Sequence, residues 1–454
     1  MNNHLLKNDL YPLLKLAIPL ALTGIVGAST GFFETMFLAK LGSDILAAGA
    51  LVSWLYGTFA VILYGTLSSI NILVSHKHGA NDQVGISLVA RDGILLGLLM
   101  TIPAFFLFWN MSPIFLLFGQ NPSIVSLAES YLHALAWGLL PNFISIAIFE
   151  FIIGLGHTRI IMYFTVFGVS LVIFFSYALI FGAFGFPALG IAGAGWGMTI
   201  SYWIIAIVIS LFVLSYKDYK HYFRSIFNKN NPSYLGELFR LGLPMGTMYC
   251  FEVGFFFALT LVMGSLGSSL LAANQIVMQY LCILMSVIFS IAQAITVRMG
   301  HLLGAKDTTL AKHAAYTGTL ISATFMGIIA IAFWVCPSVL ISVDIDIHNP
   351  RNANIINEIT ILFAVSALFQ IIEGTRISLF GALRALKDTN FTLLASIISF
   401  WGIALPIGYS LATHFQMGGI GLWWGMVLGA SCSVLLLYWR FKSKIRCYMP
   451  HESA

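Results

Sequence analysis

Long apolar segments separated by short polar ones run along the whole chain. Each segment has about 20 residues or more, the length an α-helix needs to cross the ~30 Å hydrocarbon layer of a bilayer. The pattern therefore predicts twelve transmembrane helices and an all-α membrane protein, without the short alternating strands of a barrel. The approximate ranges are 13–38, 45–75, 93–116, 125–153, 160–182, 187–215, 238–263, 270–299, 315–341, 357–383, 391–413 and 417–440.

The first part of the chain recurs 225 residues later without a gap. The matching positions run from Pro19 and Pro244 to Asp82 and Asp307. Six predicted helices precede the most polar internal break and six follow it, so both copies have the same orientation in the membrane. This arrangement indicates a parallel internal repeat, which is typical of transporters with a substrate path between two halves.

The polar break also sets the expected domain limits. We expect an N-terminal six-helix lobe, a cytoplasmic linker, a C-terminal six-helix lobe and a cytoplasmic tail. Their ranges are 1–215, 216–237, 238–440 and 441–454.

Composition indicates that the protein lies in a membrane, and the distribution of charge indicates its orientation there. Hydrophobic residues make up 59% of the 454 residues and charged residues only 9%, which excludes a soluble globular domain. With a cytoplasmic N-terminus, all of the 22 Lys and Arg residues fall on inner segments except Lys40, Arg351 and Arg376. We therefore expect a multi-pass protein of a bacterial inner membrane with both termini in the cytoplasm. The basic residues follow topology and form no nucleic-acid face.

Small residues recur at helical spacing in two places. Gly27 and Gly31 stand four residues apart, and so do Gly421, Gly425 and Gly429. This spacing predicts close packing of helix backbones, with a hinge as the alternative.

Residues that often bind metals are present but scattered. The five cysteines form no CxxC motif, so we expect packing roles for them. His76, His78 and His301 lie where helices meet the cytoplasm and lack further convergent ligands, so we predict no metal site. We expect no cofactor apart from a coupling ion.

Two acidic residues fall deep in the membrane, where a charge must face a cavity or a partner. Glu252 lies about 20 Å and Glu373 about 16 Å from the inner helix ends. Arg376 lies one turn from Glu373. One hypothesis is a cation or proton site of Glu252 and Glu373 that Arg376 tunes. The alternative is a structural Glu373–Arg376 pair that leaves Glu252 as the only titrating group.

Two further acidic residues lie closer to the membrane surfaces. Glu34 is near the outer end of the first helix. One hypothesis is that it is a coupling residue, and the alternative is an interfacial residue with a solvated carboxylate. We interpret Glu150 as structural, paired with Arg159 or with another residue of its lobe.

Aromatic residues are candidates for contact with flat cationic substrates through cation–π interactions. Most aromatic side chains of such a chain pack against lipid or core. The candidates for the substrate cavity are Tyr56, Tyr249, Tyr280 and Trp401.

Short motifs across nearly the whole chain resemble those of the MATE (multidrug and toxin extrusion) transporters, and Glu252 fits the NorM-like branch best. No single motif is decisive, but their order on a six-plus-six repeat is specific. The motifs are Gly31-Phe32-Phe33-Glu34-Thr35-Met36, Leu271-Ala272-Ala273-Asn274-Gln275-Ile276, Gly381-Ala382-Leu383-Arg384 and Phe184-Gly185-Phe186-Pro187.

This resemblance implies an antiporter that expels organic cations in exchange for Na⁺ or H⁺ by rocking two lobes. Glu252 and Glu373 would form the cation site of the second lobe, and Glu34 the acidic position of the first. Phe369 stands where a tyrosine is common and Ser176 where an asparagine is common. With Phe369 one oxygen ligand is missing, and many members have Asp where this chain has Glu34 and Glu373. Together with Arg376, which would compete with a bound cation, these departures favour proton coupling over Na⁺.

Two other functions remain as alternatives. A flippase for a lipid-linked precursor would need a cationic cavity for phosphates, whereas Arg376 is the only basic residue placed deep in the membrane. An enzyme would need a convergent catalytic or metal-binding set, which the sequence lacks, so we expect no enzymatic activity. The expected partners are small organic cations and membrane lipid, with no nucleic acid, and nothing requires more than a monomer.

Overall fold

The computed structural model describes residues 3–224, 232–346, 349 and 352–448. Within these ranges every regular element is helical, and twelve segments are long and apolar enough to span a membrane. The predicted all-α fold is therefore confirmed. Lys229, Arg351 and the end of the tail lie outside the described residues, so the expectations about them stay predictions.

The chain divides into two compact units, and each division falls inside a helix. Unit 1 comprises Met1–Ala21 and Thr247–Ala454, and unit 2 comprises Leu22–Gly246. The two helices that change unit are α1 (Asn3–Ala39) and α10 (Leu235–Leu266). In α1 the boundary between the units follows Ala21, two residues after Pro19, and in α10 it follows Gly246, two residues after Pro244. The two boundaries are therefore separated by the same 225 residues as the repeat. The lobe limits expected from the sequence stay predictions.

Unit 2 is organised around α6 (Pro122–Gly154), which packs on α2, α3, α4 and α8. The short α9 packs on α4 and α8. Besides α6 and parts of α1 and α10, the elements are α2 (Ser43–Leu67), α3 (Ser69–Gly79), α4 (Gln83–Trp109), α5 (Ser112–Leu117), α7 (Thr158–Phe181), η1 (Ala183–Gly185), α8 (Ile191–Ser215) and α9 (Lys217–Arg224).

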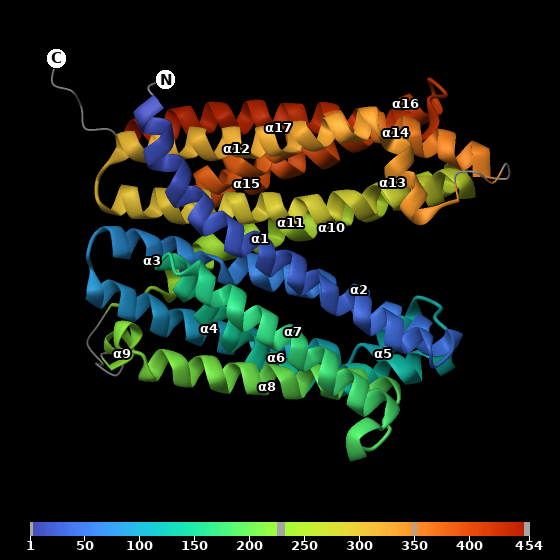
Figure 1. Ribbon diagram of the computed structural model, residues 1–454, viewed down its shortest axis with the longest axis horizontal. Coiled ribbons are helices and arrows are strands. Elements are labelled where there is room, and N and C mark those ends of the chain that lie inside the picture. Colours follow the sequence, from blue (N-terminus) through green and yellow to red (C-terminus); the bar gives the residue numbers. More distant parts are fainter. Residues whose placement is uncertain (1–2, 225–231, 347–348, 350–351, 449–454) are drawn as a thin grey trace. The chain divides into compact units, whose positions relative to one another are not determined.

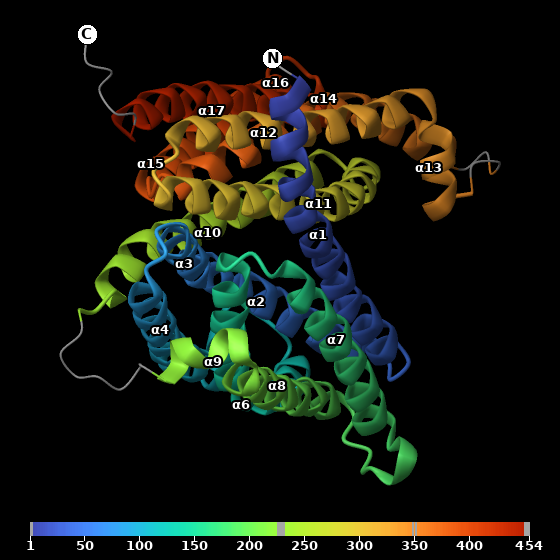
Figure 2. The ribbon, with the colours of Figure 1, turned by 60° about the vertical axis from the view of Figure 1, so that its left-hand side comes forward.

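Unit 1 is organised around α14 (Ala353–Ala385), which packs on α11, α12 and α17. These helices run side by side in Figures 1 and 2. The other elements are α11 (Ser268–Gly304), α12 (Thr308–Val335), α13 (Pro337–Asp344), α15 (Thr389–Ser396), the π-helical η3 (Ile397–Ala404), α16 (Leu405–Thr413) and α17 (Gly418–Tyr448).

The repeat is preserved in local backbone geometry. Asp82 caps α4 by accepting from the Gly85 N–H at 2.8 Å, and Asp307 caps α12 by accepting from the Leu310 N–H at 2.9 Å. The residue before each cap has a left-handed backbone, with φ of 55° at Asn81 and 63° at Lys306. The two copies therefore use the same turn between equivalent helices.

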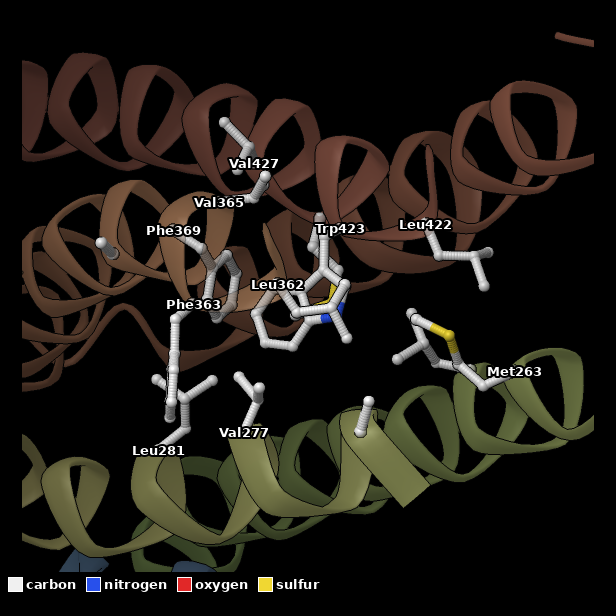
Figure 3. Packing of buried hydrophobic residues seen from close by; sticks show 14 of the residues in the cluster. Met263, Val277, Leu281, Leu362, Phe363, Val365, Phe369, Leu422, Trp423 and Val427 are labelled. Carbon is white, nitrogen blue, oxygen red and sulfur yellow. The ribbon is translucent and has the colours of Figure 1, made fainter. Parts of the chain in front are cut away.

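A large apolar cluster fills the space between α11, α14 and α17 in unit 1. At its centre Trp423 reaches from α17 and lies beside Leu362 of α14 (Figure 3). The indole N–H donates to Asn274 Oδ1 at 3.1 Å, so the buried polar atom of this large side chain is satisfied.

Close backbone packing is confirmed on α17. A Cβ atom on Gly425 would lie 2.4 Å from Gly408 Cα and 2.5 Å from Ala404 O, and Gly421 and Gly429 are similarly crowded. For Gly27 and Gly31 the same expectation is wrong, because a Cβ atom there meets nothing within 4 Å. The same spacing therefore has different causes on the two helices.

Gly425→Ala should destabilise the protein, because the added methyl group must push the α16 and η3 backbone away. Overpacking of this kind costs about 1–3 kcal/mol. The measurement is the thermal unfolding midpoint of purified protein. Gly327→Ala in α12 is the matched control, since a Cβ atom on this glycine would meet nothing within 4 Å. Equal midpoints for the two variants would contradict the close approach.

Candidate functional site

Three charged side chains meet in the interior of unit 1. Glu252 comes from the middle of α10, and Glu373 and Arg376 come from α14, one helical turn apart. All three are almost entirely buried. The two helices thus bring together the charges that the sequence predicted to be deep in the membrane, and we call them the ion triad.

Arg376 bridges both carboxylates of the ion triad. Its Nε donates to Glu373 Oε2 at 2.8 Å and its Nη2 to Glu373 Oε1 at 2.6 Å, which is a bidentate pair. Its Nη1 donates to Glu252 Oε1 at 2.8 Å. Arg376 thus contacts both acids, and which of them titrates stays a prediction.

Burial makes the interactions of the ion triad mutually dependent. A buried charge is tolerated only when it is paired and hydrogen-bonded. The face of Phe400 lies 4.8 Å from the Arg376 guanidinium carbon and adds a cation–π contact. With both carboxylates ionised, two negative charges face one positive charge, so the site retains one net negative charge.

Ser396 is a further polar member of this site that the sequence did not indicate. Its hydroxyl donates to Glu252 Oε1 at 2.8 Å and lies 3.2 Å from Arg376 Nη1. Ser396 is the last residue of α15, directly before the π-helical stretch η3. No charge or motif marks such a serine in the sequence, because its role depends on how this helix is turned towards α10.

Unit 2 contains a separate polar cluster, with which no Lys or Arg of its described residues forms an ion pair. Glu34 of α1 is buried and accepts a hydrogen bond from the Tyr131 hydroxyl. The Tyr56 hydroxyl lies 2.9 Å from that of Tyr202 and accepts from Asn142 Nδ2 at 3.1 Å. Glu34 is therefore not the solvated interfacial residue of the alternative hypothesis.

The central helices show how the chemistry of the two copies differs. Helices α6 and α14 are both 33 residues long, and each is the central helix of its unit. Counted from the first residue of each helix, Asn142 and Ser145 have the places of Glu373 and Arg376. By this count, neutral polar groups stand in α6 where α14 has an acid and a guanidinium.

The two family departures lie in packed surroundings. Phe369 is buried in the apolar cluster of unit 1, and its ring lies edge-on to Trp423 at 5.8 Å. Ser176 belongs to unit 2, where a Cβ on Gly197 would lie 2.5 Å from its backbone nitrogen. Whether either residue tunes the ion site stays a prediction.

The proposed cavity aromatics of unit 1 all have polar partners. The Tyr249 hydroxyl accepts from Arg384 Nη2, Tyr280 donates to Leu340 O at 2.9 Å, and Trp401 donates to Phe251 O at 3.0 Å. Contact of these residues with substrate stays a prediction.

Two other sequence-derived candidates have a structural setting. Glu150 is fully buried in unit 2 and accepts from Asn71 Nδ2. In the described part of the chain, no group of three or more His, Cys, Asp or Glu residues is arranged to hold a metal ion.

Comparisons with known proteins agree with the internal repeat and identify a family. The MatE family profile matches residues 19–178 and again 244–410, which reproduces the 225-residue repeat. The "Probable multidrug resistance protein NorM" of Burkholderia mallei is 32% identical over 95% of this chain and 92% of its own length. "Multidrug resistance protein NorM" of Burkholderia vietnamiensis is 31% identical over 431 residues, 95% of this chain and 93% of its own.

The fold has solved counterparts as well. The Vibrio cholerae MATE transporter VcmN in the bent form has a TM-score of 0.88 at 16% identity, covering 98% of this chain and 99% of that one. At such low identity this similarity concerns the fold alone. Because the MatE profile covers most of the chain in both copies, this protein is a member of the MatE family.

Proposed function

We propose that this protein is a secondary active multidrug efflux transporter, which expels organic cations in exchange for protons by alternating access. Support comes from its membership of the MatE family and from relatives named multidrug resistance proteins. The observation that carries the mechanism is the ion triad of Glu252, Glu373 and Arg376.

The net charge of the ion triad provides the attraction for substrate. A single uncompensated negative charge in a medium of low dielectric constant attracts an organic cation strongly. Protonation of Glu252 removes this charge and leaves Arg376 paired with Glu373 alone. The triad is then neutral and no longer favours the bound cation. Substrate and proton thus exclude each other, which is the requirement for exchange.

Occupation of the carboxylate oxygens favours H⁺ over Na⁺ as the coupling ion. Both oxygens of Glu373 and one oxygen of Glu252 already accept from Arg376. An inorganic cation needs several oxygen ligands, and here it would share the carboxylates with a guanidinium beside it. A proton needs only one carboxylate oxygen.

Glu34 is the proposed coupling residue of unit 2. It is buried and held by Tyr131, so its protonation changes the hydrogen bonding of a packed interior.

We propose further that the protein lies in a bacterial cytoplasmic membrane with both termini inside. A role as a lipid flippase is less compatible with the triad, because Arg376 is occupied by carboxylates and is not available to a phosphate.

Glu252→Gln and Glu373→Gln should each abolish proton-driven efflux, because each removes the excess negative charge and its proton acceptor. The measurement is uptake of a fluorescent organic cation into everted vesicles with an imposed pH gradient. Glu129→Gln is the matched control, since Glu129 is a half-exposed acid in contact with His133. Undiminished transport by either triad variant would refute the mechanism.

Arg376→Gln should make transport and stability dependent on Na⁺. Removing one partner of a buried ion set costs about 3–5 kcal/mol, because the remaining charges lose their compensation. A bound Na⁺ can replace the lost positive charge. Thermal stability and pH-driven efflux are compared in sodium and choline chloride. The wild type should show no difference between the salts, and strict dependence of its efflux on Na⁺ would contradict proton coupling.

A further inference from the structure

A second arginine is buried in unit 1 without an acidic partner. Arg384 lies in the last turn of α14 with 6% of its surface exposed. In the described part of the chain no carboxylate lies within ion-pairing distance of it. The other arginines discussed in this unit differ, because Arg376 contacts two carboxylates and Arg440 contacts Asp388 at 2.6 Å.

Aromatic groups replace the missing carboxylate. The guanidinium carbon of Arg384 lies 3.9 Å from the ring centroid of Phe380 and 5.4 Å from that of Tyr249. Its Nη2 donates to the Tyr249 hydroxyl. A cation in the last turn of a helix is also favoured by the helix dipole. These contacts explain how the positive charge is tolerated.

One donor of Arg384 remains unexplained. The Nε–H is buried and has no hydrogen-bond partner among the residues that the structure describes. An unsatisfied buried donor is unfavourable, and such groups often mark the place of a water, an ion or a ligand. The guanidinium fork matches the two oxygens of a carboxylate. An oxyanion that accepts from Nε would satisfy the donor and neutralise the charge together.

Arg384 is related to the ion triad in two ways, through its own helix α14 and through Tyr249 on α10. Glu373, Phe380 and Arg384 are spaced by seven and four residues on α14, so they share one face over about 16 Å. On α10, Tyr249 is one turn from Glu252. The hydroxyl of Tyr249 accepts from Arg384, so this residue joins the helix that carries Glu252 to the buried arginine.

We propose that Arg384, Tyr249 and Phe380 form an anion subsite that binds the carboxylate of amphoteric substrates. The cationic group of the same molecule is attracted to the ion triad, so this proposal rests on the proposed function for that half of the ligand. A molecule with both charges satisfies both sites, whereas a simple cation uses only one.

The test compares a rhodamine that carries a free carboxylate with its methyl ester, which differ only in this anionic group. Fluorescence polarisation measures their binding to purified protein in nanodiscs of zwitterionic lipid. Arg384→Gln should weaken binding of the acid by about tenfold or more, because a charge-assisted hydrogen bond is lost. Binding of the ester should stay within about twofold of wild type, a change too small to count as loss of such a bond.

Two variants control for a structural role of the arginine. Arg384→Lys keeps the charge without the fork and should restore part of the acid binding. Arg440→Gln removes the same charge from an arginine that already has a carboxylate partner, and should change neither ligand. Thermal stability of each variant is measured alongside. Equal weakening of acid and ester by Arg384→Gln, or no weakening of either, would overturn the subsite.

A lipid head group is the other possible source of an oxyanion. Nanodiscs with anionic lipid should leave binding of the acid unchanged, and competition by that lipid would assign the subsite to phosphate and overturn its role in substrate binding. Binding needs no coupling ion. A protein that binds the acid through Arg384 but shows no proton-driven efflux would therefore contradict the proposed function and leave the subsite intact.

Discussion

The burial of Arg376 between two carboxylates is the constraint on which the chemistry of this protein depends. A guanidinium in the interior of a membrane protein is stable only if its donors are matched, and Glu252 and Glu373 match three of them. The same contacts fix α10 against α14. A change in the charge of either carboxylate would therefore alter contacts between these two helices.

The two copies of the repeat separate scaffold from chemistry. Turns and helix caps are shared, as Asp82 and Asp307 show with their equivalent hydrogen bonds. The polar interior is not shared, because Arg376 joins two acids in unit 1 whereas Glu34 of unit 2 accepts from Tyr131. The two bundles thus have similar turns and caps around interiors of different chemistry.

The sequence predicted the parts of the structure that depend on local pattern. The twelve helices follow from apolar length, and helical spacing places Glu373 and Arg376 one turn apart on α14. It could not predict that Arg376 contacts both acids, because this depends on how α10 and α14 are rotated towards each other. Ser396 was missed for the same reason. The glycines at 27 and 31 have the spacing of a packed seam, yet a Cβ atom on either would meet none of the described residues within 4 Å.

The division of α1 and α10 between the units has a consequence for the origin of the fold. Each unit takes the start of one helix from the opposite copy of the repeat, up to Ala21 in one case and Gly246 in the other. A single copy is therefore incomplete. The first helix of each copy begins in the other copy's unit, and the unit that the copy forms takes its missing helix start from the other copy. A protein with one copy of the repeat would have to exchange helix ends between two identical chains to complete its units. In this chain both copies are present, so the exchange is internal.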